Sequence, residues 1–89
     1  MTNSADIPPP AHLLDARGLL CPLPILRARK MLKTLPRDAF VTIIASDPGA
    51  IKDFPVFCRQ TGATLHSMTQ DPDGVIRITL QNTIPDGEA

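Results

Sequence analysis

One cysteine stands where two prolines mark the start of a predicted helix, and this position is suited to thiol chemistry. The segment 19–24 reads Leu-Leu-Cys-Pro-Leu-Pro. The residue before a proline avoids the α region, so Cys21 should be extended, whereas Pro22 has a φ suited to the first helical position. Cys21 is therefore predicted to be the N-cap, with its sulfur facing unpaired N–H groups and the positive end of the helix dipole.

A sulfur in this place should have a lowered pKa, and the thiolate is the nucleophilic form of cysteine. Pro24 has no N–H, so only the N–H of Leu23 remains to donate to the sulfur. We therefore expect an activated thiolate that is not saturated with hydrogen bonds. The alternative is that Cys21 is a buried structural residue, because free cysteine often serves as a small core residue.

The neighbours of the cysteine should fix the backbone around it. The residues expected to shape the site are Gly18, Pro22, Leu23 and Pro24. Gly18 forms a predicted bend with Arg17, where glycine permits a positive φ or the close approach of another segment. Arg17 and Arg27 are the two cations that we expect to support a negative charge on the sulfur.

Composition excludes several other kinds of function. The 89 residues fit one small domain, and nine basic and nine acidic residues give a net charge of zero. No global field therefore attracts nucleic acid, and without Trp or Tyr there is no stacking platform for single strands. No apolar run is long enough for a membrane span, and the first ten residues lack the basic start and apolar stretch of a secretory signal. We therefore expect a cytoplasmic protein with reduced thiols. The scattered cysteines and histidines match no zinc spacing, and no metal is expected.

The remaining pattern predicts one folded domain at 12–82 between a flexible proline-rich tail at 1–11 and a loose tail at 83–89. The expected strands are 12–16, 39–45, 64–70 and 75–81, and the expected helices are 22–35 and a second one from 46–49 to Gly62. Ser46 or Asp47 is available to cap the second helix. The order predicts an α/β (α+β) two-layer sandwich, β-α-β-α-β-β, with a four-stranded mixed sheet and both helices on one face.

Apolar spacing indicates which side chains form the core of this sandwich. The predicted inward residues are Ile25, Ala28, Leu32 and Leu35 of the first helix, Ile51, Phe54 and Cys58 of the second, and Ile76, Ile78 and Leu80 of the last strand. Cys58 is thus expected to be structural. Pro55 should interrupt the second helix, so that its first turn is separate or kinked.

The motifs in order resemble the TusA-like (SirA-like) sulfur-carrier family. Residues 14–24 read Leu-Asp-Ala-Arg-Gly-Leu-Leu-Cys-Pro-Leu-Pro, with the family's Cys-Pro-x-Pro core at the end. The likeness continues through Ala-Ser-Asp-Pro-Gly at 45–49, Lys-Asp-Phe-Pro at 52–55 and Phe-Cys at 57–58. Cys-Pro-x-Pro alone is a weak signal, but these elements together cover about residues 13 to 81.

The resemblance implies a sulfurtransferase that carries sulfane sulfur as a persulfide on Cys21, with no other cofactor. Such a protein receives sulfur from a cysteine desulfurase or rhodanese-type donor and passes it to a DsrE-like or other acceptor protein. A monomer that forms transient complexes is expected. The position between the prolines is often acidic in members that serve tRNA thiolation, whereas here it is Leu23. The pathway therefore stays open among tRNA thiolation, molybdenum-cofactor biosynthesis and sulfur oxidation.

Two other classes of function stay open beside the sulfur carrier. The first is a thiol redox module in which Cys21 forms mixed disulfides, although the chain lacks a Cys-x-x-Cys partner. The second is a non-catalytic regulatory or docking protein that uses the apolar edge formed by Leu19, Leu20 and Leu23. A role for Cys58 in redox chemistry is not decided by the sequence.

Overall fold

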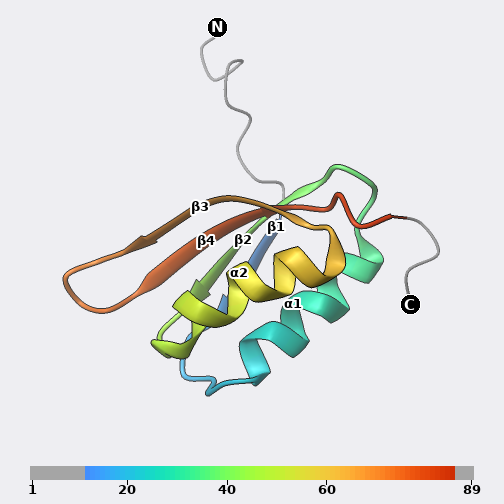
Figure 1. Cartoon of the computed structure of the whole chain (residues 1–89). Helices are drawn as coiled ribbons and strands as arrows, with labels where there is room; N and C mark the ends of the chain where they lie inside the picture. Colours follow the sequence, from blue (N-terminus) through green and yellow to red (C-terminus); the bar gives the residue numbers. More distant parts are fainter. Residues whose placement is uncertain (1–11, 86–89) are drawn as a thin grey trace, which may run out of the picture.

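Four strands form one sheet, and two helices cover one of its faces (Figure 1). The computed structural model describes residues 12–85, so the predicted tail at 1–11 and residues 86–89 lie outside the described residues. The elements are β1 (His12–Ala16), α1 (Leu23–Thr34), β2 (Phe40–Ala45), α2 (Gly49–Thr61), β3 (Thr64–Gln70) and β4 (Ile76–Gln81). The predicted two-layer class and the order β-α-β-α-β-β are confirmed.

The strand order across the sheet is β1-β2-β4-β3, and the sheet is mixed. β1 runs parallel to β2, as a strand–helix–strand crossover requires, while β4 pairs antiparallel with both β2 and β3. The two central strands therefore supply most of the sheet's core. Their inward residues Val41, Ile43, Ala45, Ile76, Ile78 and Leu80 are all at most 1% exposed.

The inner face of α2 differs by one residue from the predicted face. Ile51 is 39% exposed, and Ala50 is buried instead, with Phe54 and Phe57. The expectation for Ile51 is wrong because residues 50, 54 and 57 follow helical spacing, which places position 51 about one residue around the helix. The predicted separate first turn is also wrong, since α2 runs unbroken through Pro55. A proline removes one hydrogen bond, and the burial of Phe54 and Phe57 on either side keeps the helix in place.

Hydrogen bonds at the C-terminal ends of the two helices hold these ends in place. Gly62 ends α2 with a φ of 94°, and its N–H donates to the carbonyl of Cys58 at 2.9 Å. At the other helix, the buried side-chain amide of Asn82 donates to the carbonyls of Leu32 and Leu35 at 3.2 and 3.0 Å. Because these carbonyls belong to the last turn of α1, the end of β4 supplies partners that the helix itself cannot.

Within the described residues, neither helix has the length and apolar character needed to cross a membrane. After β4, the chain passes the C-terminal end of α2. The hydroxyl of Thr83 donates to the carbonyl of Gly62 at 2.5 Å, and Ile84 packs against the core. The end of the sheet is therefore fastened to the end of α2.

Candidate functional site

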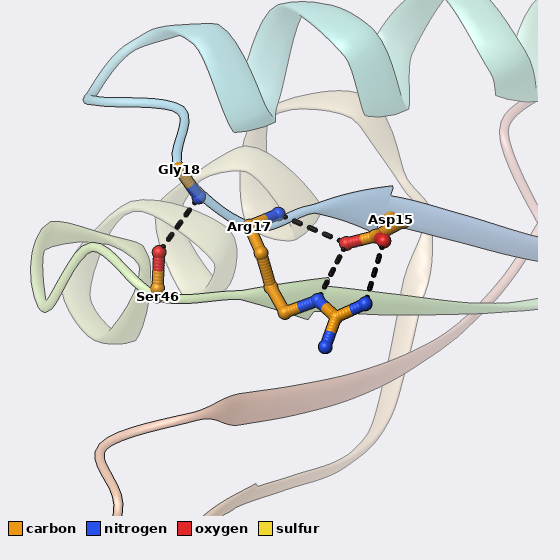
Figure 2. Close-up of polar contacts among 4 residues, drawn as sticks. All are labelled: Asp15, Arg17, Gly18 and Ser46. Carbon is orange, nitrogen blue, oxygen red and sulfur yellow. Dashed lines mark hydrogen bonds and ion pairs between the residues drawn. The ribbon is translucent and has the colours of Figure 1, made fainter.

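Two loops meet at the same end of the sheet, and the loop that follows β1 carries Cys21. Because β1 and β2 are parallel, with Ala16 opposite Ala45, the loops that follow these strands leave the sheet at the same end (Figure 1). The N–H of Gly18 donates to the hydroxyl of Ser46 at 2.8 Å (Figure 2). These contacts fix the cysteine loop against the loop before α2.

A second bond between the loops holds the cysteine itself. The backbone N–H of Cys21 donates to Asp47 Oδ2 at 2.7 Å. The start of α2 passes very close, since a Cβ added at Gly49 would lie 3.5 Å from the Cβ of Cys21 and 3.3 Å from Asp47 Oδ2. A larger residue at position 49 would crowd the Asp47 carboxylate that accepts the N–H of Cys21, whereas its Cβ would make only an ordinary contact with Cys21 itself.

The helix after Cys21 begins one residue later than predicted. Pro22 is the N-cap, with φ −100° and ψ 19°, and it follows a cis peptide bond from Cys21. The first helical residue is Leu23, whose N–H donates to the carbonyl of Leu20 at 2.8 Å. The expected cap by the sulfur is therefore wrong, because the turn at 20–23 uses the N–H that was expected to reach it. No side chain caps α1.

The sulfur instead donates to a carboxylate on the other helix. The Cys21 thiol is exposed, and its Sγ lies 2.7 Å from Asp53 Oδ2. This hydrogen bond, then desolvation and the negative charges of Asp53 and Asp47, raise the pKa of the Cys21 thiol above its ordinary value. The expected lowering of the pKa is wrong, because carboxylates from α2 and the preceding loop disfavour the thiolate.

A shallow groove of about 240 Å³ runs from the thiol along the seam between the helices. It is lined by Cys21, Pro22, Ile25, Arg29, Asp53, Val56, Phe57 and Gln60. The guanidinium of Arg29 lies over the Phe57 ring, 5.3 Å from its centroid. The α2 side of the groove follows the spacing 53, 56, 57 and 60, which is one face of a helix. Asp53 is not among the site residues predicted from the sequence, and this periodicity is the signal that could have identified it.

The two predicted supporting cations are not the groups that contact the thiol. Arg17 forms an ion pair with Asp15 at 2.8 Å, and this contact lowers the pKa of Asp15 to about 2 (Figure 2). Arg27 is exposed on α1. Both hydrogen bonds of Cys21 found within residues 12–85 are to carboxylates, so support by Arg17 and Arg27 stays a prediction.

Among the residues predicted to shape the site, Gly18 adopts a φ of 82°, as its predicted bend allows. Pro24 is buried under the start of α1, whereas Leu23 is 44% exposed. Two further exposed apolar side chains, Leu20 and Leu26, accompany it at 69% and 51% exposure. The predicted apolar edge is therefore confirmed for Leu20 and Leu23, while Leu19 packs partly against the core.

The second cysteine is in a different environment. Cys58 lies in the core with 7% of its surface exposed, so its predicted core position is confirmed. Burial raises the pKa of the Cys58 thiol to about 11. Both cysteines are free thiols. In the part of the chain that the structure describes, no three His, Cys, Asp or Glu residues are grouped to hold a metal ion.

The fold and the site together define a small two-layer α/β protein that presents one exposed thiol just before a helix. The sequence profile of the family described as Sulfurtransferase TusA matches residues 12–82. The chain therefore belongs to the TusA family of sulfur carriers, which act in sulfur relays. The resemblance seen in the motifs is confirmed.

Individual relatives agree with this assignment. Sulfur carrier protein TusA of Allochromatium vinosum is 54% identical over 52 residues, which are 58% of this chain and 68% of that protein. A Neisseria meningitidis protein, provisionally named sulfur carrier protein NMA0882, is 46% identical over 72 residues, 81% of this chain and 96% of its own. A crystal structure of a SirA-like protein from Desulfitobacterium hafniense shares the fold, with a TM-score of 0.69 at 24% identity, covering 79% of this chain and 95% of that one.

Proposed function

We propose that Cys21 carries the relayed sulfur as a persulfide on Sγ. The observation that carries this proposal is the contrast in access between the chain's two thiols. Cys21 is exposed beside a groove, whereas Cys58 is buried in the core. A partner's sulfur must come within bonding distance of the accepting sulfur, and only the Cys21 thiol can be reached without opening the core.

The transfer requires no net oxidation. Cys21 as a thiolate attacks the terminal sulfur of the donor's persulfide, the donor's S–S bond breaks, and the donor leaves as a thiolate that takes up a proton. An acceptor thiolate then attacks the terminal sulfur on Cys21, and Cys21 is released as a thiol. One sulfane sulfur moves at each step, so the protein is a stoichiometric intermediate that is regenerated.

The family implies a sulfur donor and a sulfur acceptor, and we infer their kinds from the resemblance to that family. A cysteine desulfurase or rhodanese-type protein presents a persulfide of the required kind, and a DsrE-like or other thiol protein would accept it. The exposed side chains of Leu20, Leu23 and Leu26 offer an apolar edge for such transient complexes of a monomer. Two free thiols suit a reducing compartment such as the cytoplasm, and direct contact with nucleic acid or membrane is not part of the proposal.

Intact-mass analysis after incubation with a cysteine desulfurase and cysteine tests the proposal. The wild-type protein and the Cys58→Ser variant should each gain one sulfur atom, while Cys21→Ser should gain none. A rhodanese with a sulfane-sulfur donor should give the same pattern. Gain of sulfur by Cys21→Ser, or its absence from the wild type with both donors, would reject Cys21 as the carrier.

One rival function has a specific observation in its favour. The exposed leucines beside Cys21 would also suit a regulatory docking protein that needs no thiol. In that case Cys21→Ala would keep its activity and Leu23→Asp would abolish it. The redox module is disfavoured, because the second thiol that would resolve a mixed disulfide is buried at Cys58.

A further inference from the structure

We propose that Asp53 holds the resting Cys21 in its protonated thiol form, and that a cationic side chain of the sulfur donor, by pairing with Asp53, releases the thiolate. The inference rests on the proposed persulfide function of Cys21, and it adds the chemistry by which a partner is recognised. It makes the carrier reactive toward its donor protein and unreactive when alone.

The geometry of one contact is the first support. Cys21 Sγ lies 2.7 Å from Asp53 Oδ2, although the two residues are 32 positions apart in the sequence. A carboxylate that accepts the thiol hydrogen favours the neutral form of the sulfur and opposes its ionisation. Asp53 also fixes the direction of the side chain, so the thiol points across the seam toward α2.

The charges around the sulfur also favour the neutral thiol. From the loop before α2, the carboxylate of Asp47 adds a second negative charge, and its Oδ2 accepts the N–H of Cys21 at 2.7 Å. From α1, Arg29 lines the same groove, but its guanidinium lies over the Phe57 ring. The sulfur therefore faces two carboxylates, and the groove's cation is engaged elsewhere.

Asp53 is also available to a partner. Its side chain is only partly buried and lines the open groove, and within residues 12–85 it forms no ion pair. An unpaired carboxylate beside a reactive atom is complementary to a Lys or Arg side chain that enters the groove. Pairing would cancel the negative charge that now opposes ionisation of the thiol.

Activation of the Cys21 thiol precedes the transfer of sulfur. The donor's cation pairs with Asp53, and the thiol proton of Cys21 passes to water. The Cys21 thiolate forms a bond to the terminal sulfur of the donor's persulfide, the donor's S–S bond breaks, and the donor thiolate takes a proton from water. No electron is gained or lost overall. In the free carrier the thiol stays protonated, which protects it from oxidants that attack thiolates.

The pH profile of alkylation tests the hold on the thiol directly. The rate of iodoacetamide reaction is measured from pH 6 to 10 in a Cys58→Ala background, which leaves one thiol. Asp53→Asn should shift the profile to lower pH and speed the reaction at pH 7 by about 3- to 10-fold, because more thiolate is present. Asp71→Asn, which removes a carboxylate in the β3–β4 turn, should leave the profile unchanged.

An unchanged or slower reaction of Asp53→Asn would overturn the proposal. Asp53→Ala is a second variant that removes the carboxylate without introducing an amide, and it should shift the profile in the same direction. Thermal unfolding of each variant shows that the fold is retained. This experiment involves no sulfur transfer, so its outcome is independent of whether Cys21 carries a persulfide.

Comparison of two sulfur sources tests the role of the donor's cation. Loading of Cys21 from inorganic polysulfide should be several-fold faster in Asp53→Asn than in the wild type. Loading from a cysteine desulfurase with cysteine should be no faster, because the cation has lost its partner. Equal acceleration with both sources would overturn the donor step. Failure of the wild type to load from either source would reject the proposed function instead.

Discussion

The surroundings of the two cysteines differ in exposure and in charge, and this difference supports the proposal that Cys21, rather than Cys58, is the thiol that serves in a relay. The pKa of each thiol is raised, but the causes are different. At Cys21 the main cause is the Asp53 carboxylate, and the sulfur is exposed. At Cys58 the cause is burial alone, with 7% of the residue exposed.

This difference determines which thiol can be activated by a partner. An opposing charge can be cancelled when a cation binds beside it, so the suppression of Cys21 is reversible in a complex. Burial can be relieved only by opening the core, and that opening costs a large part of the free energy of unfolding. A raised pKa therefore has opposite meanings at the two positions. Under the proposed mechanism it is a resting state at Cys21, whereas at Cys58 it is a consequence of packing.

The largest expected effect is the difference in alkylation rate. In the native protein at pH 8, iodoacetamide should modify Cys21 at least ~100-fold faster than Cys58, because the latter reacts only after local opening. Peptide mapping by mass spectrometry after timed quenching measures both rates. In 6 M guanidinium chloride, roughly twice the concentration that unfolds many small domains, the two rates should converge. Comparable rates in the native protein would remove the contrast between the sites.

A smaller effect is expected from changing the apolar edge beside Cys21. Leu23→Asp should slow loading from a cysteine desulfurase by about 10-fold, since an exposed apolar contact of this size contributes about 1.4 kcal/mol to a complex. Alkylation by iodoacetamide should slow much less, because that reaction needs no docking and responds only to the effect of the new carboxylate on ionisation of the thiol. Arg59→Asp, on an exposed part of α2 outside the groove lining, is the matched control. Equal slowing by both variants would indicate a general charge effect.

The smallest effect concerns stability and its dependence on pH. Cys58→Ala should lower the free energy of unfolding by about 1 kcal/mol at pH 7 through lost packing. In the wild type, burial raises the pKa of the Cys58 thiol from its ordinary value of 9.0 to about 11. Its contribution is thus fully present below pH 9 and is lost as pH rises from 9 to 11. Urea unfolding across this range should show a shallower decline in Cys58→Ala.

Cys21→Ala is the control for that measurement. Its thiol is exposed, so its removal should change the free energy of unfolding at pH 7 by less than about 0.5 kcal/mol. The pKa of the Cys21 thiol is also raised in the folded protein, so its removal should make the alkaline decline shallower as well, but less than in Cys58→Ala because the thiol is exposed. A larger loss of stability in Cys21→Ala than in Cys58→Ala would contradict the assignment of the first residue to the surface and of the second to the core.

The sequence alone was sufficient for the architecture and for the core position of Cys58. Alternating apolar residues at 76, 78 and 80 predicted the core face of β4, and the helical spacing of Ala28 and Leu32 predicted that of α1. Such patterns are local consequences of backbone periodicity, so they can be read without knowing what packs against them. The motif around Cys21 likewise predicted the loop that presents the exposed thiol, since proline restricts the backbone and glycine permits a positive φ through their own covalent structure.

Only the tertiary structure decided the electrostatic environment of the thiol. Reasoning from the local sequence placed the sulfur at the helix end and predicted a lowered pKa. In the structure the N–H of Leu23 donates to the carbonyl of Leu20, and the thiol of Cys21 donates to Asp53. Asp53 reaches Cys21 because parallel pairing of β1 and β2 brings two loops to one edge and sets α2 beside α1. Charge acts through space over a few ångströms, and the distance between residues 21 and 53 is set by the fold rather than by either segment.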